Sequence, residues 1–471
     1  MMLSRRRLLE LAGASSASLF LSHALGGCAA PAPAGPWWTS GNYGPVEGEI
    51  DAVDLAVEGS LPPELRGVFL RNGPNPVAGS SSFWFFGDAM LHGVRLEGGR
   101  AVWYRNRYIR TLPYTSGASA RGDVSLLANY ANTALVRHAG RTLALYEGGL
   151  PTEITTSDLG TVGEHDFAGA LRGPMGAHPK IDPVTGEMVF IGYSPFAPYL
   201  TVHHVDAGGA LVRSEPITIP GGRMIHDFQL TERNVILFDL PVVFDLEAAE
   251  TDGFPFRWSP ELGARLGVMP RSGGDADVSW IEVDPFYMFH SLNAWDDGDR
   301  VVLLGARHDH MWANGPDDET SHPTLHRWTL DAAARTGSVE ALDDRLYEFP
   351  RIDVRRQGLA TRYGYGLGFE LGARVDLPKR PNALVKYDLD GGTLDRFDFA
   401  VGQQPDEPVL ASAGEGEDHG YLLTMVHDAA TDSSSVAVFD ATDVAGGPIA
   451  RVAMPRRVPF GFHGDWLADE A

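Results

Sequence analysis

The sequence contains one cysteine, Cys28, among its 471 residues. Everything after that position can therefore form no disulfide, no thiolate metal site and no cysteine nucleophile. Positive charge is also scarce, because 38 lysines and arginines stand against 62 aspartates and glutamates, which gives a formal net charge of −24. Such a chain would repel a phosphate backbone, so we expect no nucleic-acid partner.

The N-terminal segment lacks an apolar run long enough to span a bilayer comfortably. Its sequence, "SRRRLLELAGASSASLFLSHALGGC", places Arg5, Arg6 and Arg7 before a short, serine-rich apolar stretch. This layout is typical of an export signal, and the Ser-Arg-Arg-x-Leu-Leu core resembles a twin-arginine signal. "LGGC", which ends at Cys28, resembles the sequence before the lipidated cysteine of bacterial lipoproteins. We predict an export signal at residues 1–28 and a periplasmic or membrane-anchored protein, with an uncleaved N-terminal anchor as the alternative.

Helical periodicity is rare from about residue 55 onward, where short apolar strands alternate with Gly, Asp and Pro turns. Residues 29–44, which begin "AAPAPAGPWWTS", are predicted to be a linker, and residues 45–471 a single all-β domain. A loose unit of strand, acidic turn residue, small turn and second strand recurs seven times at intervals averaging about 57 residues. Its acidic residues are Glu97, Asp158, Asp206, Asp284, Asp331, Asp388 and Asp440.

Seven such units predict a seven-bladed β-propeller. The Asp284 unit is weak, so six or eight blades stay open, and two or three β-sandwiches are a further alternative. Propellers commonly close their ring by pairing an N-terminal strand with the last blade. We therefore expect the C-terminal "PFGFHGDW" to belong to the body of the fold.

Four of the sixteen histidines share an apolar or small-residue setting: His178, His226, His290 and His463. They lie 48, 64 and 173 residues apart, which is close to one, one and three blade repeats. Because the innermost strands of a propeller all face its axis, one histidine from each of four blades would meet there. Four imidazoles without thiolates suit iron, copper, nickel or zinc. A buried, hydrogen-bonded histidine is the alternative for each position taken singly.

Ten segments in order resemble the signature blocks of the carotenoid cleavage oxygenase family, over about residues 45 to 467. They are "LRGVFLRNGPNP", "FFGDAMLHGVRL", "ANTALV", "ALYEGG", "AHPKIDPVTGEM", "MIHDFQLT", "FHSLNAW", "YEFPRID", "DEPVLA" and "GFHGDW". The family includes carotenoid and apocarotenoid oxygenases, lignostilbene dioxygenases and the retinoid isomerohydrolase. The resemblance implies a seven-bladed propeller whose loops and short helices form a cap over the metal face.

The resemblance also implies the site. One Fe(II) per chain would be held by His178, His226, His290 and His463, with Glu147, Glu348 and Glu407 accepting hydrogen bonds from imidazoles. Three glutamates serve four histidines, so we expect His178 to lack such a partner. Thr133 would line the open side of the iron. Candidate tunnel residues, each of which could equally be core, are Phe83, Trp84, Phe85, Tyr130, Tyr146, Phe286, Phe289 and Phe369.

The implied reaction is cleavage of an alkene by O₂ into two carbonyl products. Stilbene-cleaving relatives typically carry a lysine immediately before the "EGG" glutamate, where this chain has Tyr146. An aromatic residue there favours an apolar polyene, a carotenoid or apocarotenoid, over a lignostilbene. Two different functions stay open as well: a metal-free propeller that binds a partner, and isomerisation or ester cleavage on the same iron. Contact with a membrane surface is a further expectation, and the oligomeric state stays open.

Overall fold

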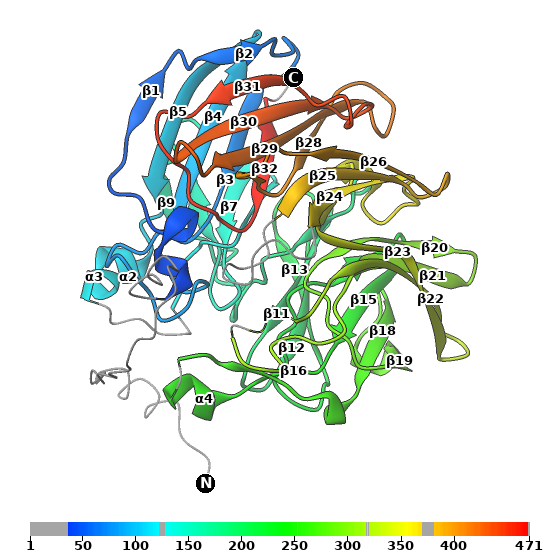
Figure 1. Cartoon of the computed structure of the whole chain (residues 1–471). Coiled ribbons are helices and arrows are strands. Elements are labelled where there is room, and N and C mark those ends of the chain that lie inside the picture. The colour runs from blue at the N-terminus through cyan, green and yellow to red at the C-terminus, as the bar shows by residue number, and fades with distance from the viewer. Residues whose placement is uncertain are drawn as a thin grey trace, which may run out of the picture.

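Antiparallel sheets fan out around a common centre in the computed structural model of the protein (Figure 1). The structure describes residues 36–121, 128–251, 253–316, 318, 320–369 and 381–469. The predicted export signal, Cys28 and residues 29–35 of the predicted linker lie outside the described residues.

The first four blades follow the chain in order. Blade 1 consists of β1 (Asp51–Val53), β5 (Arg100–Tyr108), β4 (Met90–Glu97), β3 (Gly67–Arg71) and β32 (Gly464–Ala468). Blade 2 consists of β6 (Ala134–His138), β7 (Arg141–Leu145), β8 (Thr152–Ile154) and β9 (Thr161–Glu164). Blade 3 consists of β10 (Lys180–Ile181), β11 (Met188–Tyr193), β12 (Leu200–Val205) and β13 (Leu211–Ile217). Blade 4 consists of β14 (Gln229–Leu230), β15 (Asn234–Asp239), β18 (Ala264–Pro270) and β19 (Ser279–Val283).

A single long strand, β23 (Thr336–Arg351), joins blades 5 and 6, because its first part pairs with β22 and its end pairs with β24. Blade 5 begins with β20 (Ser291–Asp297), β21 (Arg300–Arg307) and β22 (Thr324–Asp331). Blade 6 continues with β24 (Tyr363–Phe369), β25 (Pro381–Asp388) and β26 (Thr393–Asp398). Blade 7 consists of β27 (Gln403–Pro405), β28 (Val409–Ser412), β29 (Gly420–Asp428), β30 (Ser433–Asp440), β31 (Pro448–Ala453) and β2 (Val57–Gly59).

The prediction of a seven-bladed propeller is therefore confirmed, and six blades, eight blades and β-sandwiches are excluded. The seven acidic turn residues fall one to each blade. Asp284, the weak member of that series, follows the outermost strand β19 and leads out of its blade, whereas Asp206 turns from β12 into β13. The displaced position of Asp284 thus accounts for the long interval before it and the short interval after it.

The two ends of the chain close the ring. The C-terminal β32 pairs with β3 from Gly67↔Ala468 to Arg71↔Gly464, and Figure 1 shows this red strand beside the blue N-terminal ones. The N-terminal β2 in turn adds to the edge of blade 7 through β31. The C-terminal segment is consequently part of the innermost layer of the propeller, as expected from "PFGFHGDW".

Elements outside the blades are short. They are the helices α2 (Leu112–Thr115), α3 (Ala118–Arg121) and α4 (Leu246–Thr251), the hairpin of β16 (Val242–Phe244) and β17 (Phe256–Trp258), and the 3₁₀ turns η1 (Trp37–Thr39), η2 (Gly41–Tyr43), η3 (Pro260–Leu262), η4 (Asp275–Asp277) and η5 (Val354–Arg356). Figure 1 shows the three α-helices outside the sheets. Among the described residues, no helix has the length and apolarity of a membrane span.

Residues 36–44 differ from the predicted linker, because they fold back onto the propeller. Trp38 donates its indole N–H to the carbonyl of Ser81 at 3.0 Å, and Trp37 lies edge-on to Trp84 with ring centroids 5.8 Å apart. Tyr43 is buried against the same ring. Burial of these large aromatic rings outweighs the linker-like composition before them, so the packed part of the chain begins before residue 45.

Candidate metal centre and cavity

Every blade places a candidate residue at or close to its innermost strand, and blade 2 adds Glu147, which follows β7. Blades 1 to 7 supply, in order, His463, Thr133, His178, His226, His290, Glu348 and Glu407. His463 and His290 directly precede β32 and β20, whereas His178 and His226 stand two and three residues before β10 and β14. This common placement explains why residues so far apart in the sequence meet.

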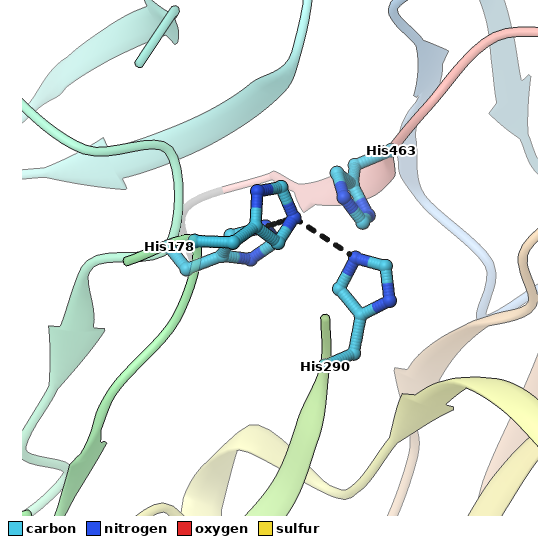
Figure 2. Close-up of side chains that lie close together, drawn as sticks. His178, His290 and His463 are labelled. Carbon is cyan, nitrogen blue, oxygen red and sulfur yellow. Dashed lines mark hydrogen bonds between the residues drawn. The ribbon is translucent and has the colours of Figure 1, made fainter. Parts of the chain in front are cut away.

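The four histidines form a cluster in which their ligand nitrogens all lie within 4.8 Å of one another. Nε2 of His226 lies 2.9 Å from Nε2 of His178 and 3.2 Å from Nε2 of His290. Figure 2 shows His178, His290 and His463 turning their rings toward this common point. The structure thus brings together the four histidines that the sequence singled out.

Three of these imidazoles have a carboxylate on the opposite ring nitrogen. Nδ1 of His290 donates to Glu348 at 2.7 Å, and Nδ1 of His463 donates to Glu407 at 2.8 Å. Nδ1 of His226 lies 3.0 Å from Glu147, at a less favourable hydrogen-bond angle. Since a carboxylate only accepts, the proton of each ring sits on Nδ1 and the lone pair of Nε2 faces the centre.

His178 differs from the other three histidines. Within the part of the chain that the structure describes, no carboxylate accompanies its ring, and its closest polar contact is Nε2 of His226. Burial and the neighbouring histidines lower the pKa of His178 well below its ordinary value. Its imidazole is therefore neutral and offers a further lone pair to the cluster.

The second oxygen of each glutamate is held by a residue that the sequence had not assigned to the site. The Tyr193 hydroxyl donates to Glu147, and Nε2 of His308 donates to Glu348 at 3.2 Å. Arg351 donates to Glu407 through Nε at 3.0 Å and Nη2 at 2.9 Å. These three partners lie 46, 40 and 56 residues from their glutamates. Because the spacing does not recur, the sequence pattern could not predict them.

The titration behaviour of the site follows from these contacts. Burial disfavours the charged forms of Glu348 and Glu407, but His290 and His308 around the first and Arg351 and His463 around the second hold both pKa values well below their ordinary range. Burial alone would lower the pKa of His290, yet the Glu348 carboxylate raises it. Burial lowers the pKa of His463 to about 4.

The donor set fits a divalent cation. Two nitrogens bound to one metal at about 2.1 Å each and at right angles lie about 3.0 Å apart, which matches the 2.9 and 3.2 Å spacings of the Nε2 atoms. Converging lone pairs would repel one another without a positive ion between them. In addition, three glutamates stand against the one guanidinium of Arg351 and place negative charge beside the imidazoles.

A β-bulge aims Glu348 at the centre. The register of β23 against β24 shifts between Glu348 and Arg351, and Phe349 has a positive φ of 54°. An aromatic residue in the left-handed region costs about 1–3 kcal/mol and persists only where its surroundings enforce it. Here the Phe349 ring stacks on His290 with centroids 5.2 Å apart, and its N–H donates to Glu348. The strained backbone consequently fixes both the carboxylate and the wall beside the ligand.

A cavity of about 250 Å³ opens beside the histidines. Most of its exposed wall is aromatic and apolar, and its polar lining groups are chiefly the histidines and glutamates of the candidate metal centre. The lining residues are Trp84, Phe85, Phe86, Thr133, Tyr146, Glu147, Tyr193, Met224, His226, Phe256, Phe289, His290, His308, Glu348, Phe349, Phe462 and His463. Such a chamber suits an apolar molecule held against a metal ion.

The candidate tunnel residues divide into two groups. Trp84, Phe85, Tyr146 and Phe289 line the cavity. Phe83, Tyr130, Phe286 and Phe369 are not among its described lining residues. Phe286 stacks on Trp328 inside the fifth blade, Tyr130 packs edge-on behind Tyr146, Phe83 packs against Phe254, and Phe369 ends β24. Apolar character alone did not distinguish the wall from the packing behind it.

Thr133 lines the cavity and is 7% exposed. Its hydroxyl donates to the side-chain oxygen of Asn132 at 3.1 Å, and its carbonyl accepts the N–H of His463 at 3.1 Å. Thr133 thereby joins blade 2 to the ligand of blade 1. It contributes a small polar surface beside the cluster without offering a carboxylate or imidazole.

Comparison with known proteins identifies this combination of fold and site. The family model described as retinal pigment epithelial membrane protein matches residues 43–468. The carotenoid cleavage oxygenase of Mycobacterium tuberculosis is 35% identical over 91% of this chain and 97% of its own length. The chain belongs to the carotenoid cleavage oxygenase family. The family resemblance of the ten sequence blocks is thereby confirmed.

Solved structures of carotenoid cleavage oxygenases share the fold closely. The lignostilbene dioxygenase of Pseudomonas brassicacearum superposes with a TM-score of 0.85 at 29% identity, covering 94% of this chain and 100% of that chain. The cobalt-substituted apocarotenoid oxygenase of Synechocystis gives a TM-score of 0.81 at 26% identity, covering 92% and 98%. The family likeness thus extends over the whole propeller.

Proposed function

We propose that this protein is an Fe(II)-dependent dioxygenase that cleaves a C=C bond of a carotenoid or apocarotenoid into two carbonyl products. The observation that carries the proposal is the convergence of four histidine Nε2 atoms beside an apolar cavity. The named activities of the carotenoid-cleaving and apocarotenoid-cleaving relatives support it. One Fe(II) ion per chain, bound by His178, His226, His290 and His463, would supply the activation of O₂.

The residues of the chain have positioning roles in this reaction. Glu147, Glu348 and Glu407 fix the ring orientations, so that Nε2 of each partner histidine stays aimed at the centre. Aromatic walls hold the polyene beside the ligands and exclude water. Both oxygen atoms of O₂ enter the products, so the reaction needs no external reductant and no protein acid or base.

The test is product analysis with iron-loaded protein under ¹⁸O₂. Incubation with an apocarotenal should give two carbonyl fragments, each of which carries ¹⁸O when analysed before exchange with water. Label in neither fragment would indicate hydrolysis or isomerisation instead. Metal analysis after anaerobic addition of Fe(II) separates the enzyme, with one iron per chain, from a metal-free propeller that binds a partner, with none.

A phenolic alkene is the second candidate substrate, favoured by the likeness to the lignostilbene dioxygenase, and Tyr146 is compatible with it. The Tyr146 side chain lines the cavity, and burial raises its pKa well above the ordinary value, so its hydroxyl stays protonated and able to hydrogen-bond a phenol. Removing one neutral hydrogen bond of about 1 kcal/mol would lower kcat/KM about fivefold. Tyr146→Phe should therefore lower turnover of a 4-hydroxystilbene but leave turnover of a hydrocarbon carotenoid nearly unchanged.

We further propose that the chain is exported with its metal already bound and is anchored through an acylated Cys28. The twin-arginine-like pair of Arg5 and Arg6 and the "LGGC" sequence support this proposal. A tethered enzyme could take a lipid-soluble polyene directly from the bilayer. Substitution of Arg5 and Arg6 by lysine should retain the protein in the cytoplasm. Undiminished export of this variant would refute the twin-arginine hypothesis.

A further inference from the structure

A second charged network lies beneath the histidines and joins three of the ligand-bearing segments. Asp227 directly follows His226, and its carboxylate contacts Nζ of Lys180 at 2.8 Å. The same carboxylate accepts the backbone N–H of Ser291 at 2.9 Å and also the Ser291 hydroxyl. Ser291 directly follows the ligand His290. One carboxylate of blade 4 thus ties down the neighbouring strands of blades 3 and 5.

The network is buried on the propeller axis. Asp227 is 2% exposed, and the Lys180 side chain is 11% exposed. Both line a cavity of about 520 Å³ that shares His290 and His463 with the aromatic cavity, so the histidines lie in the wall between the two. In such surroundings a charge-assisted hydrogen bond holds its geometry more firmly than at the surface.

His178 is the ligand for which this network matters most. Among the described residues, no carboxylate orients its ring, in contrast to the other three histidines. Lys180, however, stands two residues after His178 at the start of β10. The ion pair between Lys180 and Asp227 therefore fixes the His178 segment against the neighbouring His226 segment. Each of the other three rings is instead positioned directly by a glutamate.

We propose that Asp227 is a positioning residue for the metal centre, which holds the His178 segment through Lys180 and the His290 segment through Ser291. This inference rests on the proposed metal centre. Asp227 does not touch the ligand ring nitrogens in the described contacts, and it acts by keeping two backbone segments in register with its own. A residue of this kind controls metal affinity and coordination geometry, beyond any contribution to folding stability.

The chain offers a matched control for a purely structural ion pair. Lys386 of β25 contacts Asp418 at 2.8 Å, and it joins blade 6 to blade 7 as Lys180 joins blade 3 to blade 4. The Lys386 side chain is 7% exposed, close to the 11% of Lys180. The Lys386–Asp418 pair lines neither of the two cavities beside the histidines. Loss of this pair should cost stability but leave the metal centre intact.

The experiment measures anaerobic binding of Co(II) to metal-free protein through the visible d–d absorption, together with the melting temperature. Asp227→Asn and Lys180→Met should raise the Kd for Co(II) about 10- to 100-fold and change the band shape. Lys180→Arg, which keeps the charge, should raise the Kd for Co(II) less than Lys180→Met does. Lys386→Met should lower the melting temperature but shift the Kd by less than about twofold.

Ser291→Ala is a milder variant, which keeps the inference testable if Asp227→Asn or Lys180→Met does not fold. It removes the hydroxyl that donates to Asp227 and accepts from Gln229 at 3.0 Å, but keeps the backbone N–H bond, and it should raise the Kd for Co(II) about fivefold. An unchanged Kd and spectrum in Lys180→Met and Ser291→Ala, or an equal shift in Lys386→Met, overturns the inference. If the unaltered protein binds neither Co(II) nor Fe(II), the proposed function itself fails and this inference fails with it.

Discussion

Glu407 is the glutamate whose loss should damage both the fold and the metal centre. Its carboxylate is 3% exposed and accepts from His463 at 2.8 Å, from the N–H of Gly464 at 2.8 Å and from two nitrogens of Arg351. Each oxygen serves two donors. In Glu407→Gln, the new NH₂ group must therefore face two N–H groups whichever way the amide turns, and the half-buried Arg351 charge loses its carboxylate partner.

The expected magnitude follows from these contacts. Removing one partner of a buried ion pair costs about 3–5 kcal/mol, and the 27% exposure of the Arg351 side chain places this case near the lower bound. Loss of the carboxylate on His463 should also weaken metal binding about 10- to 100-fold. Urea unfolding of metal-free protein measures the first effect, and Co(II) titration measures the second.

Glu348→Gln is the informative comparison, because its partners His290 and His308 are imidazoles and no guanidinium is left unpaired. It should weaken metal binding by a similar factor but lower the free energy of unfolding by only about 1–3 kcal/mol. The surface variant Glu97→Gln should change neither quantity measurably. If Glu407→Gln proved no less stable than Glu348→Gln, or bound Co(II) as tightly as the unaltered protein, the roles assigned to these contacts would be refuted.

Three further predictions concern acidity, metal removal and the C-terminal segment. Burial lowers the pKa of His92 to about 3 and that of His203 to about 4, so below about pH 6.5 the unfolded chain binds protons that the folded chain does not. As the pH is lowered from about 6.5 to 4, the free energy of unfolding should therefore fall by about 1.4 kcal/mol per pH unit for each histidine. In urea titrations over this range, His92→Gln should reduce the slope by the contribution of one proton. Removal of bound metal by a chelator should lower the melting temperature and re-addition of Fe(II) should restore it, whereas a melting temperature insensitive to metal would count against the site. Gly461→Ala should sharply reduce soluble expression, because its Cβ would clash with the Asn72 carbonyl, while Gly402→Ala on open surface, despite its own positive φ, should be milder.

Much of this architecture could be predicted because it is periodic. The seven acidic turn residues indicated seven blades, and the intervals between His178, His226 and His290 matched three consecutive blades. A short strand and the turns on either side of it can be recognised from about ten neighbouring residues, so the local sequence was enough to predict the blades. The family resemblance then supplied the glutamates, which no spacing rule would have selected.

The unpredicted features depend on contacts between distant parts of the chain. Tyr193, His308 and Arg351 hold the second oxygens of the glutamates from other strands, and Phe349 reaches the cavity only through a β-bulge. A bulge reverses which side chains face inward, and neither its position nor its strain is visible in an apolar pattern. Four of the eight tunnel candidates line the cavity, and the other four could not be told apart from them because a buried aromatic in the wall resembles one packed behind it.

Ring closure and completion of the metal centre coincide in this fold. The fourth ligand, His463, directly precedes β32, which closes the ring against β3. The N–H of His463 is held by Thr133, and its carbonyl accepts the N–H of Asn72 at 3.0 Å. A metal ion that binds His463 only in the closed ring must therefore stabilise the pairing of β3 with β32, by the linkage between binding and folding.

Hydrogen exchange can measure this coupling. At a Co(II) concentration about 100 times Kd, closure gains about 2.7 kcal/mol, so β32 amides that exchange through ring opening should slow about 100-fold. Amides of β13, an outer strand of blade 3, exchange by local fraying and should slow far less. Equal protection of β13 and β32 would mean that the metal stabilises the propeller as a whole. Only selective protection of β32 fits a centre that locks the two ends of the chain together.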